Sequence, residues 1–338
     1  PGPGVEWQEV PVPRLGRDDI LVSVKATSIC GTDAHIYSWD PWAAERTRPP
    51  FIQGHEFAGE VVEVGANVSS VKVGQLVSCE SHVVCHVCQA CRTGNYHVCQ
   101  HTKILGVDRD GCFAEYVAVP AWNAWPNPAG TPFHIATLME PVGNAVFVVS
   151  EALVPGKNVA VLGCGPAGLA SIAVARAMGA AFIVASDLRP ARRALAERLG
   201  ADLAVDPSQW DGQAGLPSSV AARGVDVVLE MSGANSAIRQ GLRLLRTEGR
   251  MIAFGLPKDE VQLKWGEDLI MKAITVRSVV GRRLWDTWYQ LQSLLDSGRL
   301  DLELLITHRY RLTDFDTGMQ AMINGDSGKV VFSTEGVF

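Results

Sequence analysis

The first 145 residues of the chain alternate short apolar runs with glycine-containing turns. Residues 20–25 and 59–65 are rich in valine and alternate apolar with polar side chains. This period of two is typical of a strand that buries one face. The pattern predicts a β-rich domain, a partly open β-barrel, over residues 1–145.

From about residue 146 to residue 284, apolar strand patterns alternate with helical ones. The expected strands are residues 157–162, 181–186, 225–230, 249–254 and 274–279, and an alanine-rich helix is expected over residues 169–178. Such alternation predicts a parallel, doubly wound α/β sheet. From residue 285 the pattern becomes mixed again, and it ends in an apolar run at residues 328–332.

Four cysteines with the spacing C-x2-C-x2-C-x7-C lie in the loop at residues 79–105: Cys85, Cys88, Cys91 and Cys99. Closely spaced cysteines let one loop supply four thiolates to a tetrahedral zinc. Four thiolates fill the coordination shell, so this zinc is expected to be structural. Four unrelated thiols or two disulfides are the alternatives, but an intracellular chain rarely keeps disulfides and the spacing fits a metal.

A glycine-rich turn joins the first expected strand of the α/β region to its helix. The sequence Gly163-Cys164-Gly165-Pro166-Ala167-Gly168 is a G-x-G-x-x-G motif, and Asp187 ends the next strand, 19 residues after Gly168. In this context the motif is typical of dinucleotide binding, with the pyrophosphate at the helix N-terminus. Asp187 is expected to bind the ribose hydroxyls and to repel a 2′-phosphate, which favours NAD over NADP. Arg189, Arg192 and Arg193 weaken that preference, and Arg192 is a further cofactor-binding candidate.

A second set of metal-ligating residue types is scattered along the first domain. Cys30, His55 and a carboxylate, either Glu56 or Glu140, make a three-ligand set. Three protein ligands with an open position are typical of a catalytic zinc. Taken singly, Cys30 is more often a buried apolar residue, and His55 is more often a histidine whose ring is satisfied by hydrogen bonds. Their combination with a dinucleotide motif is what favours zinc.

Several longer stretches carry a resemblance to a known family. They are the zinc signature at residues 54–68, which reads Gly54-His55-Glu56-x2-Gly59-x5-Gly65-x2-Val68, and residues 30–37, 93–99, 102–108, 111–116, 140–146 and 229–234. Over nearly its whole length the chain resembles the zinc-dependent medium-chain alcohol dehydrogenases. Within that family it is most similar to the branch that oxidises L-threonine.

The resemblance implies a GroES-like β-barrel domain, an NAD-binding Rossmann domain and a return of residues 285–338 to the first domain. It also implies two zinc ions per chain, a homotetramer, and NAD-dependent oxidation of L-threonine to 2-amino-3-oxobutanoate. A short edge strand is expected to precede Pro1. A polyol or secondary-alcohol substrate is the nearer alternative.

The same resemblance gives roles to three residues of the first domain. Thr32 lies two residues after Cys30 and is expected to contact the reacting oxygen, and His35 is the next station for the proton. His82 resembles a histidine on the substrate side of threonine dehydrogenases. Glu56 and Glu140 compete for one ligand position, with Glu140 favoured, and the carboxylate left over is expected either behind the metal or facing the substrate ammonium.

Composition restricts the function further. The net charge of −6 argues against a nucleic-acid partner. The sequence contains no run of 18 uncharged apolar residues, so a membrane span is not expected. Four of the eight cysteines belong to the zinc loop, and a cytoplasmic location is expected. The more distant alternative is a binding module in which zinc and nucleotide have structural roles only.

Overall fold

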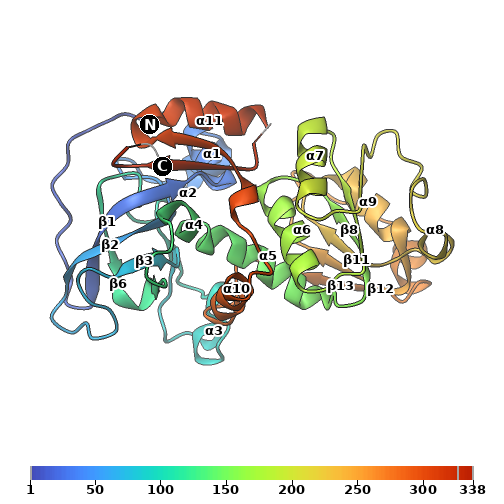
Figure 1. Ribbon diagram of the computed structural model, residues 1–338, viewed down its shortest axis with the longest axis horizontal. Coiled ribbons are helices and arrows are strands. Elements are labelled where there is room, and N and C mark those ends of the chain that lie inside the picture. The colour runs from blue at the N-terminus through green and yellow to red at the C-terminus, as the bar shows by residue number, and fades with distance from the viewer. Residues whose placement is uncertain (1, 326, 337–338) are drawn as a thin grey trace. The chain divides into compact units, whose positions relative to one another are not determined.

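The computed structural model describes residues 2–325 and 327–336, and the chain divides into two compact units (Figure 1). Unit 1 comprises Pro1–Pro141, Ile306–Asn324 and Lys329–Phe338. Unit 2 comprises Val142–Leu305 and Gly325–Gly328. The chain thus leaves unit 1 near residue 141 and returns near residue 306, compared with expected domain boundaries at 145 and 284.

Unit 1 is built on a seven-stranded sheet. Its order is β14-β15-β1-β2-β3-β7, and β6 also pairs with β1. The strands are β1 (Asp19–Ser28), β2 (Glu56–Val64), β3 (Leu76–Cys79), β6 (Tyr116–Pro120), β7 (Ala124–Pro126), β14 (Ile306–Arg311) and β15 (Lys329–Ser333). A separate two-stranded sheet joins β4 (His82–Val83) to β5 (Lys103–Ile104).

The register of this sheet brings distant parts of the sequence together. Strands β1 and β2 are antiparallel, and Ser28 at the end of β1 pairs with Glu56 at the start of β2. Strand β15 pairs with the other side of β1, and Figure 1 shows this red C-terminal strand beside the blue N-terminal one. Buried apolar side chains from β1, β2, β3 and β6 form the core, because alternate residues of each strand face inward.

The helices of unit 1 are short. They are α1 (Gly31–Ser38), α2 (Pro41–Arg46), α3 (Gln89–Arg92), α4 (Phe133–Ala136) and α11 (Phe315–Asn324), with 3₁₀ turns η1 (Tyr96–Val98), η2 (Ala121–Asn123) and η5 (Leu312–Asp314). Helix α5 (Met139–Ala152) begins in unit 1 and continues in unit 2.

Unit 2 contains a six-stranded parallel sheet of order β10-β9-β8-β11-β12-β13. The strands are β8 (Asn158–Leu162), β9 (Phe182–Ser186), β10 (Leu203–Val205), β11 (Val225–Glu230), β12 (Leu245–Ala253) and β13 (Thr275–Ser278). The helical elements are α6 (Pro166–Ala177), α7 (Pro190–Arg198), α8 (Ser218–Arg223), α9 (Asn235–Leu244), α10 (Asp286–Asp296), the π-helical turn η3 (Gly266–Ile270) and η4 (Glu303–Leu305).

The strand order of unit 2 confirms the predicted doubly wound fold. The order reverses between β8 and β11, and ligands of such sheets bind outside the carboxyl ends of the strands at this point. The loops after β8 and after β11 begin at Gly163 and Met231, so the glycine motif lies at the expected edge.

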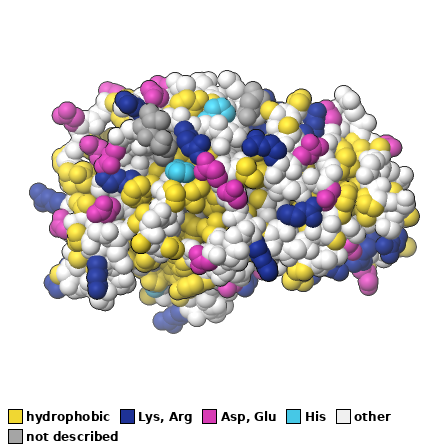
Figure 2. Space-filling model, in the orientation of Figure 1, with side chains coloured by type: hydrophobic (Ala, Val, Ile, Leu, Met, Phe, Trp, Pro, Cys, Tyr) yellow, Lys and Arg dark blue, Asp and Glu magenta, His cyan; other side chains and the backbone are white. Residues whose placement is uncertain are grey.

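The helices and the surface charges bear on the surroundings of the protein. Among the described residues, no helix has the length and apolar content needed to cross a bilayer. Figure 2 shows acidic and basic side chains interspersed on the face in view.

Candidate active site and metal centres

The four cysteines of the zinc loop converge in the structure. Their sulfur atoms all lie within 4.8 Å of one another, with separations of 4.0 Å for Cys85 to Cys91, 3.9 Å for Cys88 to Cys99 and 3.5 Å for Cys99 to Cys85. A tetrahedral zinc with Zn–S bonds of about 2.3 Å needs sulfur separations of about 3.8 Å. The loop therefore fits zinc.

Backbone N–H groups of the loop point at these sulfurs. Cys88 donates to Cys85 Sγ at 3.4 Å, and both Cys85 and His101 donate to Cys99 Sγ at 3.4 Å. Backbone hydrogen bonds from Cys91 and Gln100 lower the pKa of the Cys88 thiol to about 6. Such donors favour the thiolates that a metal requires. No fifth ligand is needed, so this site is closed to substrate.

The second set is assembled by the β1–β2 register. Cys30 is the N-cap of α1, two residues after β1, and His55 directly precedes β2. Because Ser28 pairs with Glu56, the two segments adjoin. One ligand atom each from Cys30, His55 and Glu56 lies within 4.8 Å of the others. A thiolate, an imidazole and a carboxylate suit a zinc ion that keeps an open position.

Asp33 stands behind His55 in this set. The side chain is fully buried, it accepts a hydrogen bond from the Cys30 backbone N–H at 2.8 Å, and its Oδ1 lies 3.6 Å from His55 Nδ1. Burial raises the pKa of Asp33 to about 6, against the lowering effect of His55. Burial disfavours the imidazolium of His55, but Asp33 and Cys30 outweigh it and raise the His55 pKa well above its usual value. A carboxylate behind a metal-binding imidazole is the usual means of fixing its orientation.

Glu56 is held from behind by a buried lysine. The Lys329 ammonium, at the start of β15, pairs with Glu56 Oε2 and also donates to the Ile29 carbonyl at 2.9 Å. The Ser28 hydroxyl donates to the same carboxylate oxygen. Burial opposes ionisation of Glu56, yet Lys329 and His55 lower its pKa. These contacts hold Glu56 Oε2, and the carboxylate brings one oxygen within 4.8 Å of the ligand atoms of Cys30 and His55.

Glu140, at the start of α5, is not part of this three-residue group. Its Oε1 accepts a hydrogen bond from the Ser81 hydroxyl at 2.6 Å, and its charge acts on His55. The neighbouring His82 ring is bonded through Nδ1 to Glu80 Oε1 at 2.8 Å. Glu140 and His82 are thus both held by the segment at residues 80–82, Glu140 through Ser81 and His82 through Glu80, on the same unit as Cys30.

The two expected relay residues lie on α1. Thr32 Oγ1 is 3.8 Å from Cys30 Sγ, so the hydroxyl is next to the candidate metal site. The His35 side chain is 57% exposed, and its Nδ1 lies 2.6 Å from Asp40 Oδ2. The exposure of His35 suits a group that exchanges protons with solvent.

The glycine motif of unit 2 has the geometry of a nucleotide loop. Gly163 has a φ of +97°, and a Cβ on Gly168 would lie 1.9 Å from the Gly163 carbonyl oxygen, so both positions require glycine. At Gly165, the N-cap of α6, a Cβ would meet no atom of the described residues within 4 Å apart from those of its chain neighbours. This open space next to helix N–H groups fits a pyrophosphate. Pro166 and Ala167 are the first residues of α6.

Asp187 follows β9 at the edge of this loop. Its carboxylate accepts hydrogen bonds from the backbone N–H groups of Cys164 at 2.8 Å and Arg189 at 2.9 Å. Arg192 Nη1 lies 3.9 Å from Asp187 Oδ2, and Arg193 donates to the Asp187 carbonyl at 2.7 Å. The buried Arg192 Nε has no hydrogen-bond partner among the described residues. The predicted acid and Arg192 are therefore neighbours, as a shared ribose site requires.

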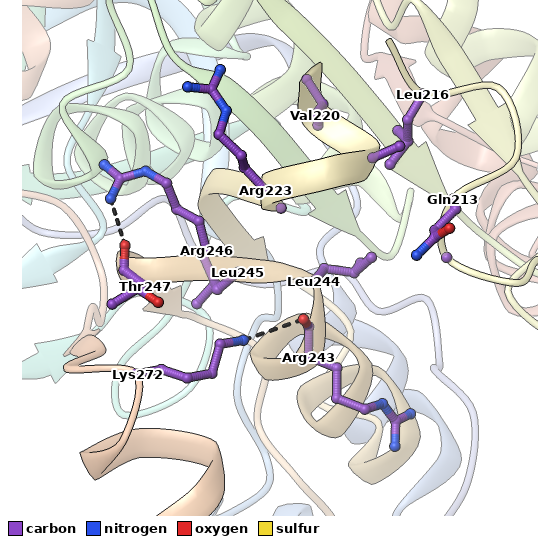
Figure 3. Close-up of a pocket in the computed structure, with 13 residues that line it drawn as sticks. Gln213, Leu216, Val220, Arg223, Arg243, Leu244, Leu245, Arg246, Thr247 and Lys272 are labelled. Carbon is purple, nitrogen blue, oxygen red and sulfur yellow. Dashed lines mark hydrogen bonds between the residues drawn. The ribbon is translucent and has the colours of Figure 1, made fainter. Parts of the chain in front are cut away.

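A separate cavity of about 310 Å³ lies in unit 2 (Figure 3). It is lined by Gly212, Gln213, Leu216, Val220, Ala221, Arg223, Gly224, Arg243, Leu244, Leu245, Arg246, Thr247 and Lys272. Its lining includes Leu245, where β12 begins, so it lies at the sheet edge opposite the glycine loop. Lys272 donates to the Leu242 carbonyl at 2.6 Å, and Arg246 pairs with Asp226 at 2.7 Å. The side chains of Lys272 and Arg246 are thus engaged by other groups of the chain. The cavity is separate from the glycine loop and is not the nucleotide site.

Sequence reasoning missed the residues that support the predicted ones. Asp33, Glu80 and Lys329 are buried charged side chains that contact a predicted site residue. Asp33 was detectable, because a carboxylate at the third helical position suits a capping box with Cys30. Lys329 had no local signal, since it lies 273 residues from Glu56.

An open zinc site that polarises a hydroxyl needs a hydride acceptor, and the loop of unit 2 fits one. This pairing defines the class of zinc-dependent nicotinamide dehydrogenases. Family models agree: residues 16–129 match the alcohol dehydrogenase GroES-like domain, and residues 166–297 match the zinc-binding dehydrogenase family. The chain belongs to the zinc-binding alcohol dehydrogenase family. Both the predicted enzyme class and the GroES-like and Rossmann fold are confirmed.

Individual relatives extend the similarity over nearly the whole chain. The L-threonine 3-dehydrogenase of Caldanaerobacter subterraneus subsp. tengcongensis is 49% identical, over 97% of this chain and 95% of that protein. The L-threonine 3-dehydrogenase of Pyrococcus horikoshii is 48% identical, over 98% of this chain and 96% of that protein. These matches confirm the predicted resemblance to the threonine branch.

Solved structures give the same fold with a nicotinamide cofactor bound. A zinc-binding dehydrogenase from Sinorhizobium meliloti 1021 bound to NADP has a TM-score of 0.87 at 29% identity, over 96% of this chain and 94% of that chain. An alcohol dehydrogenase from E. coli CFT073 complexed with NADH has a TM-score of 0.89 at 26% identity, over 98% and 97% of the two chains. Zinc and a nicotinamide dinucleotide are the cofactors of this class, as predicted.

Proposed function

We propose that the chain oxidises L-threonine to 2-amino-3-oxobutanoate. The reaction removes a hydride from the β-carbon and a proton from the hydroxyl, and it yields NADH from NAD. One observation carries the choice of substrate: the charge of Glu140 acts on His55, and Ser81, which donates to Glu140 at 2.6 Å, lies next to His82 in the sequence, so ionisable groups other than the metal ligands belong to this part of unit 1. Simple alkyl alcohols need no such groups, whereas the ammonium of threonine needs acceptors. The near-full-length similarity to L-threonine 3-dehydrogenases supports the same choice.

Cys30 and His55 are the proposed protein ligands of the catalytic zinc, with Glu56 as the third. The mutual proximity of these three groups within 4.8 Å supports Glu56 over Glu140, the carboxylate that the sequence favoured. Glu140 then faces the substrate ammonium. When bound, zinc polarises the substrate hydroxyl and the nicotinamide accepts the hydride.

The proton leaves along α1. The Thr32 hydroxyl takes up the proton of the substrate hydroxyl as it gives its own proton onward to the imidazole of His35, which releases a proton to solvent while Asp40 holds the ring. The 3.8 Å separation of Thr32 Oγ1 from Cys30 Sγ and the 57% exposure of His35 support this direction.

NAD is the proposed cofactor in preference to NADP. In this proposal the carboxylate of Asp187 accepts hydrogen bonds from the adenosine ribose and repels a 2′-phosphate, and its position directly after β9, where it contacts the glycine turn at Cys164, supports this. Arg192 lies beside it and contributes a donor to the same site. Gly163, Gly165, Pro166, Ala167 and Gly168 form the turn that receives the pyrophosphate.

A homotetramer and a cytoplasmic location complete the proposal. The location is supported by the four thiols of the zinc loop, which bind metal only where they stay reduced. The homotetramer is supported by family resemblance, and sedimentation equilibrium of the purified chain tests it.

A substrate panel tests the proposed reaction. NADH formation is followed at saturating NAD with L-threonine, D-threonine, 2-butanol, sorbitol, xylitol and 2,3-butanediol. We expect the kcat/KM for L-threonine to exceed that for 2-butanol by roughly 10⁴-fold, because a site built for polar groups rejects analogues that lack them. D-threonine is expected to be poor. If a polyol or a diol were oxidised as fast as L-threonine or faster, the assignment of threonine as the substrate would be wrong, while the assignment to the zinc dehydrogenases would stand.

A further inference from the structure

A buried carboxylate holds His82, and the mechanism above gives it no role. The Glu80 side chain is fully buried, whereas the His82 side chain is 16% exposed. Glu80 Oε1 accepts hydrogen bonds from the backbone N–H of His82 at 2.9 Å and from the His82 ring at Nδ1 at 2.8 Å. Burying a carboxylate costs free energy unless hydrogen bonds compensate, and His82 supplies two of them.

The backbone around this contact is fixed independently. Asn123, which is buried, donates through its side-chain amide to the carbonyl of Glu80 at 2.8 Å and to the carbonyl of His82 at 2.9 Å. The Glu80 backbone N–H donates to the Asn123 carbonyl at 2.8 Å. These hydrogen bonds hold the segment at residues 80–82 in place, and the Glu80 carboxylate, with the Ser81 hydroxyl 3.4 Å from the same Nδ1, contacts the His82 ring and orients it.

The middle residue of this segment supports the second polar group of the site. The Ser81 hydroxyl donates to Glu140 Oε1 at 2.6 Å. One tripeptide thus orients both the histidine and the carboxylate that the proposed function places on the substrate side. A segment with only a structural role would have no need to aim two ionisable side chains.

We propose that Glu80 is a positioning residue that sets substrate specificity through His82. By accepting the hydrogen of Nδ1, Glu80 fixes the imidazole tautomer and makes Nε2 an acceptor. Nε2 then receives a hydrogen bond from the ammonium group of an amino-acid substrate. The inference rests on the proposed function, because it needs a substrate with an ammonium group. A secondary alcohol without charged groups gains nothing from Glu80.

A double-mutant cycle with two substrates tests this role. Glu80→Ala, Glu80→Gln, His82→Ala and the Glu80→Ala/His82→Ala double variant are assayed with L-threonine and with 2-butanol. Glu80→Ala is expected to lower the kcat/KM for L-threonine about 10- to 100-fold, mainly by raising KM, as is typical when a supporting carboxylate of a site histidine is lost. The kcat/KM for 2-butanol is expected to stay unchanged. In the His82→Ala background, removal of Glu80 is expected to have no further effect.

Two controls keep the result interpretable. Glu63→Ala removes an exposed carboxylate of β2 and is expected to match the parent enzyme with both substrates. Glu80→Gln keeps an acceptor oxygen in place, so it is expected to retain more threonine activity than Glu80→Ala, and it serves if the alanine variant fails to fold.

The outcomes separate the two proposals. Equal losses with L-threonine and 2-butanol, or additive losses in the double variant, would overturn the role of Glu80 while threonine oxidation by the parent enzyme stands. A parent enzyme that oxidises 2-butanol but not L-threonine would overturn the proposed function, and this inference with it.

Discussion

The two metal-binding regions of unit 1 are built in opposite ways. The four-cysteine loop takes all its ligands from residues 85–99, and backbone N–H groups of the same loop surround the sulfurs. The candidate ligands Cys30, His55 and Glu56 come from two strand ends; Asp33 lies behind His55, and Lys329, which is distant in the sequence, lies behind Glu56. A closed site of four thiolates can only hold the chain together. A site with three ligands, buried charges behind it and polar groups beside it is arranged for chemistry.

Loss of Cys30 gives the largest expected effect on activity. Cys30→Ser removes the thiolate of the open site, and turnover is expected to fall roughly 1,000-fold or more, since metal polarisation of the hydroxyl is worth several kcal/mol. The other zinc and the melting temperature are expected to remain. Atomic emission measures the zinc content, and NADH formation measures turnover. Full activity in this variant would remove Cys30 from the metal site.

Loss of Cys91 is expected to affect stability instead. Cys91→Ser leaves three thiolates, so the loop zinc is lost and Tm falls by roughly 10 °C, because a structural zinc contributes directly to folding. Cys112→Ser is the matched control, since Cys112 is fully buried in unit 1 and belongs to neither metal set. Unchanged zinc content and Tm in Cys91→Ser would contradict the closed-site interpretation.

The buried support of the open site can be tested without touching a ligand. Lys329→Met removes the cation that pairs with the buried Glu56 carboxylate and leaves it only the Ser28 hydroxyl on that side, which is expected to lower the free energy of unfolding of the zinc-free protein by about 3–5 kcal/mol. Lys25→Met breaks the pair between Lys25 of strand β1 and Glu335, which follows β15 and is 65% exposed, and a loss of about 0–1 kcal/mol is expected there. Urea denaturation compares the two. Equal losses would mean that the Lys329–Glu56 pair has no special role behind the site.

A substitution at the expected ribose-binding residue, Asp187, is expected to have the smallest effect of the four. Asp187→Ala is expected to weaken NAD binding by about 1–3 kcal/mol, the range for losing hydrogen bonds to a charged group, and to improve the relative use of NADP. Fluorescence titration with NADH and NADPH measures both affinities. If the NADH affinity did not change, Asp187 would not be part of the ribose site.

The same contrast explains what the sequence could predict. The four-cysteine loop and the glycine motif are local, so their spacing determines their geometry, and both were predicted with their residues. The strands of unit 2 were predicted for a similar reason, because a parallel sheet buries both faces and its strands are continuous apolar runs such as β8.

The open site depends on tertiary structure. Only the β1–β2 register decides that Glu56, and not Glu140, joins Cys30 and His55, and no local pattern encodes that register. The contacts of Lys329 with Glu56 and of Ser81 with Glu140 join residues far apart in sequence, so spacing could not reveal them. Resemblance to a family supplied the roles of Thr32, His35 and His82, which their own sequence context does not predict.

Stepwise removal of zinc tests most directly whether the two regions have different roles. Dipicolinate is added to the purified enzyme, and zinc per chain, NADH formation from L-threonine and Tm are measured on the same samples. We expect activity to disappear with the first of two zinc ions while Tm is retained, and Tm to fall with the second. A parallel loss of activity and Tm with each zinc ion removed would contradict the division between a structural loop and an open catalytic site.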